Sequence, residues 1–180
     1  PASFEHYHWC IPTLVQSGDF EAYDRMRQRM IAQFGGSRDS RVAERLVKDC
    51  LILPWPDADF DLLERLSNTA LKMGPDHWAW GYAQFCKALL DYRRGRFDEA
   101  AQTAQRVLSG PGEDRNRVVQ THMVLAMTRF QLKEPAKAQE ALAAGLSYAR
   151  SHLPAEGRLL DYVGWNDWVI ARALANEATA

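Results

Sequence analysis

The segment ALLDYRRGRFDEAAQTAQRVLSGP, residues 88–111, carries the strongest structural signal in the chain. After Gly95, apolar residues recur at spacings of three and four, which places on one helix face Phe97, Ala100, Ala101, Ala104, Val107 and Leu108. The link Gly95-Arg96 is so short that the helices on its two sides must lie antiparallel. Because proline cannot continue a helix interior, Pro111 marks the end of the second helix. The segment therefore predicts a helical hairpin.

The rest of the 180-residue chain has a similar composition, and glycine and proline residues likewise separate its apolar-periodic segments. Ala and Leu together number 44, whereas Val and Ile number 13, a balance that favours helix over strand. We therefore expect an all-α protein whose hairpins span about 3–34, 40–73, 76–109 and 115–152. Their helices are predicted at 3–17, 19–34, 40–53, 59–73, 76–94, 96–109, 115–132 and 135–152, followed by a last helix at 165–179.

The hairpins repeat with a regular period. Phe20, Phe60, Phe97 and Pro135 hold the same place in successive hairpins, at spacings of 40, 37 and 38 residues. A two-helix repeat of this length predicts an α-solenoid, in which each hairpin buries its apolar face only against the next one. We expect a single domain, residues 1–180, forming a right-handed stack with the helix at 165–179 as its cap.

Two local features refine this prediction. Four aspartates precede predicted helices and are expected to accept hydrogen bonds from the free amides there, namely Asp19, Asp39, Asp59 and Asp114. Gly145 lies in the middle of a predicted helix, where glycine costs about 1 kcal/mol relative to alanine. That cost predicts a close helix–helix contact at Gly145.

The repeated hairpins of this sequence resemble the tetratricopeptide repeat (TPR) family. The third hairpin carries Ala88, the turn Gly95-Arg96-Phe97, Ala100 at the expected helix crossing and Pro111 at the close. The other hairpins match more loosely over residues 3–152. The resemblance implies a TPR-like superhelix whose concave surface binds a protein or peptide partner.

A narrower likeness is to the TPR-like tail of large bacterial serine/threonine kinases and propeller-bearing signalling proteins. It is carried by Phe34-Gly35-Gly36, Val42-Ala43-Glu44-Arg45, Cys50-Leu51-Ile52-Leu53-Pro54 and Trp168-x2-Ala171-Arg172-x4-Glu177-Ala178. The likeness implies a bacterial signalling role. Kinase signatures are missing from the 180 residues, so no kinase activity is expected from this chain.

Charge and cysteine content exclude several function classes. The formal net charge is −1, which argues against nucleic acid or a membrane surface as a partner. The sequence lacks an apolar run long enough to span a bilayer. Three widely separated cysteines are typical of reduced thiols, so a cytoplasmic location is expected.

Candidate catalytic and metal-binding residues are few. His6, His8 and Cys10 lie close together, but no second pair with ligand spacing follows, so no metal is expected. Cys86 is surrounded by apolar positions, where cysteine acts as a small hydrophobic residue. The basic run from Arg93 to Arg96 has acidic neighbours and is expected to form a solvated hairpin corner. We expect neither enzyme activity nor a cofactor.

Aromatic and methionine residues indicate the candidate binding surface. They follow helical spacing on the first helices of the third and fourth hairpins, which line the concave side in the TPR family. The predicted groove consists of Tyr82, Phe85, Leu89, Tyr92, Met123, Met127 and Phe130. Such a groove suits an apolar or amphipathic helix. The alternative is that the chain fills it with its own end, where Trp165 and Trp168 supply apolar area.

Two other functions stay open at this stage. The array could be a structural spacer or a dimerisation module, in which case the aromatic residues form a homodimer interface. A small-molecule sensor or enzyme built on the same scaffold would need a deep pocket with convergent polar groups. His77, Trp78 and His122 are the residues to inspect for such a pocket.

Overall fold

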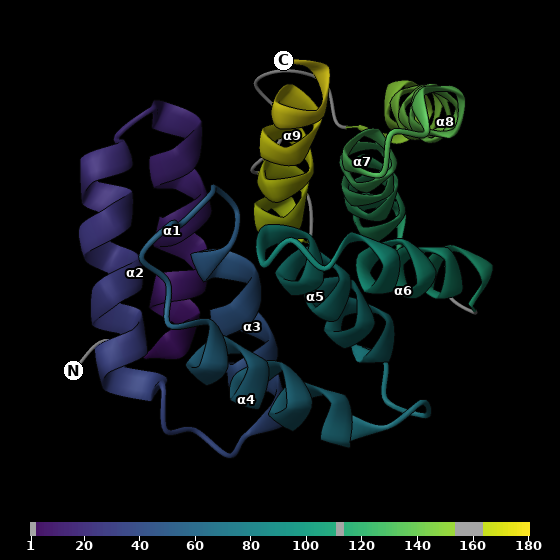
Figure 1. Cartoon of the computed structure of the whole chain (residues 1–180). Coiled ribbons are helices and arrows are strands. Elements are labelled where there is room, and N and C mark those ends of the chain that lie inside the picture. Colours follow the sequence, from purple (N-terminus) through teal and green to yellow (C-terminus); the bar gives the residue numbers. More distant parts are fainter. Residues whose placement is uncertain (1–2, 111–113, 154–163) are drawn as a thin grey trace.

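The computed structural model describes residues 3–110, 114–153 and 164–180, and all regular secondary structure in these ranges is helical (Figure 1). The elements are α1 (Phe4–Ser17), α2 (Phe20–Phe34), α3 (Ser40–Cys50), α4 (Phe60–Ala70), the 3-10 turn η1 (Leu71–Met73), α5 (Trp80–Arg93), α6 (Phe97–Ser109), α7 (Arg115–Gln131), α8 (Pro135–His152) and α9 (Trp165–Thr179). The all-α prediction is confirmed for the described part of the chain.

The helix ends follow the local chemistry at most predicted positions. The carboxylates of Asp19, Asp39 and Asp59 accept hydrogen bonds from amides in the first turns of α2, α3 and α4, as predicted. Asp114 does not cap α7 with its side chain; its carboxylate lies 3.5 Å from the Arg117 guanidinium instead. Helix α5 begins at Trp80, four residues later than predicted.

Consecutive helices pack as pairs, and neighbouring pairs are in contact. The pairs are α1–α2, α3–α4, α5–α6 and α7–α8. The first helices also contact one another in the order α1, α3, α5 and α7, while α2, α4 and α6 each contact the next pair. Gly18 and Gly95 adopt positive φ angles of 77° and 79° at two of the turns, a conformation that glycine enters without a Cβ penalty.

The last helix, α9, occupies a position that differs from the expected cap. A cap would cover the outer face of the last hairpin, whereas α9 packs chiefly against α7 and α1 (Figure 1). It therefore connects the last hairpin to the first. The four first helices and α9 surround a common interior.

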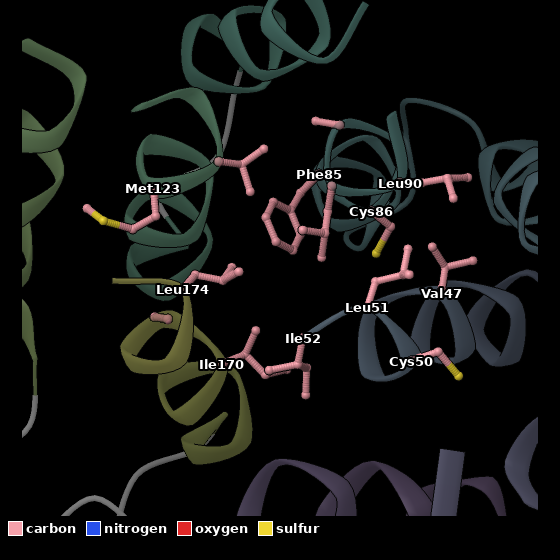
Figure 2. Packing of buried hydrophobic residues seen from close by; sticks show 14 of the residues in the cluster. Val47, Cys50, Leu51, Ile52, Phe85, Cys86, Leu90, Met123, Ile170 and Leu174 are labelled. Carbon is pink, nitrogen blue, oxygen red and sulfur yellow. The ribbon is translucent and has the colours of Figure 1, made fainter. Parts of the chain in front are cut away.

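This interior is the hydrophobic core. Figure 2 shows side chains from three regions of the chain meeting there: Ile52 after α3, Phe85 from α5, and Ile170 and Leu174 from α9. Each of these four side chains is fully buried. Because α9 contributes so much apolar surface, its docking stabilises the array of hairpins.

Gly145 confirms the predicted close contact between helices. A Cβ atom placed on Gly145 of α8 would lie 2.7 Å from the Cβ of His122 on α7 and would also collide with the Met123 Cε. Carbon atoms in contact are normally separated by about 3.5–4.0 Å. Only glycine therefore allows α7 and α8 to approach this closely.

Candidate partner-binding cleft

Most residues of the predicted groove lie in the interior. Tyr82, Phe85, Leu89, Met123 and Met127 are all buried, so the expectation of an open surface is corrected at these positions. Phe85 belongs to the common core, and Met123 reaches Gly145 of α8. The Tyr82 hydroxyl donates a hydrogen bond to Asn116 Oδ1 at 2.5 Å.

Three of the predicted residues line a surface cleft. Tyr92 from α5, with Met127 and Phe130 from α7, borders a depression of about 460 Å³ between α7, α8 and the end of α9. Ala138 and Leu142 of α8 and residues 177–180 complete its walls, and most of the lining is apolar. Phe130 is 63% exposed, which is unusual for so large an apolar side chain. We call this depression the Phe130 cleft.

The hairpin turns place these aromatic residues at the surface. Phe130 lies in the last turn of α7, just before Lys133, which adopts a positive φ of 61° in the turn to α8. Tyr92 lies in the last turn of α5, with its ring centroid 6.0 Å from that of Phe97. Both rings therefore extend from the ends of helices whose positions are set by packing against α6 and α8.

Charged groups surround the Phe130 cleft. The Lys133 ammonium lies 5.9 Å from the centroid of the Phe130 ring. Glu134 pairs with Arg129 at 2.6 Å and with Lys137 at 2.8 Å, and these hydrogen bonds lower its pKa. Lys137 is well exposed, so its ammonium remains accessible to solvent. The cleft thus combines an apolar floor with the Lys133 ammonium beside the Phe130 ring and the Glu177 carboxylate in its wall.

A network of buried polar groups lies under α9, and sequence reasoning did not find it. The Lys48 ammonium lies 2.8 Å from Glu44 Oε1 and 2.8 Å from Asp167 Oδ1. His8 Nδ1 lies 2.9 Å from Asp49 Oδ2. The sequence does not indicate that Lys48 is buried, because a lysine in an amphipathic helix normally faces solvent.

The electrostatics of this network follow from burial and pairing. Desolvation alone would lower the pKa of Lys48, but Asp167 and Glu44 raise it well above its usual value, so the lysine is charged. The pKa of Asp167 is lowered: burial opposes ionisation, and the charge of Lys48 more than offsets that effect. The pKa of Asp49 is raised because its complete burial outweighs the neighbouring His8.

Arg93 was predicted to lie in a solvated hairpin corner, but it holds neighbouring segments together instead. Its side chain is nearly buried and donates hydrogen bonds to the carbonyl oxygens of Leu51 and Ile52, at 3.1 and 2.8 Å. It also donates to Glu177 Oε2 at 2.7 Å. Arg94, in contrast, pairs with Asp61 at the surface, as expected for a hairpin corner.

The candidate metal and catalytic residues do not converge. His6 closes the first turn of α1 with Ser3, while Cys10 is exposed. Across residues 3–110, 114–153 and 164–180, no three His, Cys, Asp or Glu side chains are grouped so that they could hold a metal ion. Burial and Glu44 raise the pKa of the Cys86 thiol well above its usual value, which disfavours the reactive thiolate.

Two of the three residues named for a sensor pocket lie together, and the third lies elsewhere. His77 stacks on Trp78 before the start of α5, with ring centroids 5.7 Å apart, and both line a surface depression of about 400 Å³. His122 lies at the α7–α8 contact, where burial lowers its pKa. Of the helices that the structure describes, none is both long enough and apolar enough to cross a lipid bilayer.

Comparison of the chain with protein-family models, with curated proteins and with solved structures finds no match. The geometry described above is therefore the basis for the function proposed next.

Proposed function

We propose that this protein is a non-catalytic interaction module built on a TPR-like array of hairpins, and that it binds a peptide or helix of a protein partner in the Phe130 cleft. The observation that carries the proposal is the exposure of Phe130 in a mostly apolar depression at the ends of α7 and α8. Large exposed aromatic residues beside an apolar depression are typical of protein interaction sites. A role within a larger bacterial signalling protein is part of the same proposal.

The chemistry of the cleft favours an amphipathic partner. Tyr92, Met127, Phe130 and Leu142 offer contacts to one or two large apolar side chains. Lys133 beside the Phe130 ring favours an acidic residue next to that apolar anchor.

The size of the cleft sets the expected affinity. Burying a large apolar side chain contributes about 1.5–3 kcal/mol, and the cleft accommodates only a few such groups. Association and ordering costs remove a substantial part of this gain. A partner with a dissociation constant no tighter than micromolar, the equivalent of about −8 kcal/mol, is therefore expected.

A peptide-display selection against the intact chain tests the proposal. A selected peptide is then titrated against Phe130→Glu, which places a charge in the apolar cleft, and against Trp78→Glu as a matched control. Trp78 is 68% exposed but does not line the Phe130 cleft. We expect Phe130→Glu to weaken binding at least about tenfold, while Trp78→Glu leaves it unchanged. Equal affinity for both variants would refute the cleft as the binding site.

Light scattering separates this function from dimerisation. A partner-binding module stays monomeric when its concentration is raised, with Phe130 free at the surface. A dimer that Phe130→Glu dissociates would instead assign the cleft to a second copy of the chain.

A further inference from the structure

Helix α9 is held against the rest of the protein by polar contacts near both of its ends. At its start, the carbonyl oxygen of Asp167 accepts a hydrogen bond from Gln120 Nε2 at 2.7 Å, and the Asp167 carboxylate pairs with Lys48. Asn166 contacts the His8 ring. At its end, Glu177 pairs with Arg93. Such a set of buried polar partners specifies position and direction, which apolar packing alone does not.

The two cations that receive α9 are also held by groups outside α9. Lys48 pairs with Glu44 one turn earlier in α3, and Arg93 donates to the carbonyl oxygens of Leu51 and Ile52. Both side chains are therefore positioned by the hairpins themselves. A surface with cations fixed in advance is ready to receive acidic groups, because little side-chain ordering is left to occur on binding.

Between these ends, α9 presents apolar side chains to the hairpins. Trp168, Ile170, Ala171 and Leu174 are buried, and Figure 2 shows Ile170 and Leu174 beside Ile52 and Phe85. Asp167 and Glu177 are ten residues apart, which corresponds to about 15 Å along a helix. The surface under α9, which we call the α9 groove, thus accepts an apolar helix face flanked by two acidic residues.

We propose that the α9 groove is a helix-recognition site with α9 as its built-in occupant, and that the partner it fits is an amphipathic helix of the same chemistry. That helix carries an acidic residue directly before a tryptophan and a second acidic residue ten positions after the first. In the resting chain α9 blocks the site. A tethered helix has an effective concentration of about a millimolar, so a partner helix displaces it only when the tethered contacts weaken.

This inference does not depend on the Phe130 cleft being a binding site. The α9 groove is formed by Lys48, Gln120 and Arg93 together with the core, and it meets the Phe130 cleft at the last turn of α9, because residues 177–180 also wall that cleft. The two proposals can still fail separately, because the groove is tested at Asp167, ten residues before that shared turn, and the cleft is tested at Phe130.

The test uses the intact chain and a fluorescent synthetic peptide with the sequence of residues 164–180. Binding is followed by fluorescence anisotropy for the wild type and for Asp167→Ala, which removes the acid that pairs with Lys48 in the tethered helix. The matched control is Asp98→Ala, which removes an exposed acid from α6. Circular dichroism verifies that each variant is helical.

We expect Asp167→Ala to bind the peptide at least about tenfold more tightly than the wild type and Asp98→Ala. A peptide with lysine in place of Asp167 should not bind any of them. Equal binding by wild type and Asp167→Ala, or equal binding of both peptides, would overturn the proposal, because α9 would then be a permanent part of the core.

A second variant keeps the result decisive. If Asp167→Ala fails to fold, Glu177→Ala replaces it, since the Glu177 side chain is 24% exposed and Arg93 keeps its two carbonyl partners.

Discussion

Replacing Gly145 by alanine sets two opposing effects against each other. In an exposed helix, the change stabilises by about 1 kcal/mol, because alanine restricts the unfolded chain and favours helix. Here the new Cβ would lie 2.7 Å from the His122 Cβ, and this atom cannot move unless α7 itself shifts. Overpacking costs about 1–3 kcal/mol. The cost here falls in the upper part of that range, about 2–3 kcal/mol, because both the His122 Cβ and the Met123 Cε lie within 3 Å of the new atom. We therefore expect a net loss of about 1–2 kcal/mol.

Urea and thermal denaturation followed by circular dichroism measure this loss. In a chain of this size, 1–2 kcal/mol lowers the midpoint of thermal unfolding by about 2–8 °C. The control is Ala144→Gly at the exposed neighbouring position, which should cost about 1 kcal/mol through helix propensity alone. If Gly145→Ala is as stable as the wild type or more stable, α7 and α8 do not approach as closely as the structure places them.

Two more perturbations check the packing and the buried charges. Ala100 of α6 is fully buried, so Ala100→Trp should destabilise by about 1–3 kcal/mol or more in urea denaturation, whereas the same change at exposed Ala144 should not. Asp167 has a pKa below its unfolded value because of Lys48, so its stabilising contribution is present above about pH 4 and is lost as the pH falls through the lower, folded pKa. The pKa of Asp49 is raised, so protonation of Asp49 on acidification changes stability in the opposite sense. The stability of the wild type is therefore compared with that of Asp167→Asn between pH 2 and 6, because the two proteins differ only in the contribution of Asp167. The wild type should lose more stability than the variant on acidification, and parallel curves would contradict the assignment.

The candidate site was only partly predictable. Tyr92, Met127 and Phe130 were expected on a binding surface and do line a cleft, whereas Phe85 was expected there and lies at the centre of the core. Helical spacing places all of them on helices but does not say which face another element will cover. Arg93 shows the same limit, because its burial depends on Leu51 carbonyl geometry that no pattern in the sequence encodes.

Local chemistry by itself determined the helices and their ends. The short Gly95-Arg96 link, the proline at the start of α8 and the aspartate caps act within a few residues, so their effects follow from the sequence. The position of α9 was decided only by the tertiary structure. Contacts of α9 with α1 join groups as distant in the sequence as His8 and Asn166, and only the folded chain decides whether Lys48 faces solvent or Asp167. A buried charge is tolerated when a distant segment of the chain supplies a group of opposite charge. That group cannot be identified from the sequence of the helix that carries the buried charge.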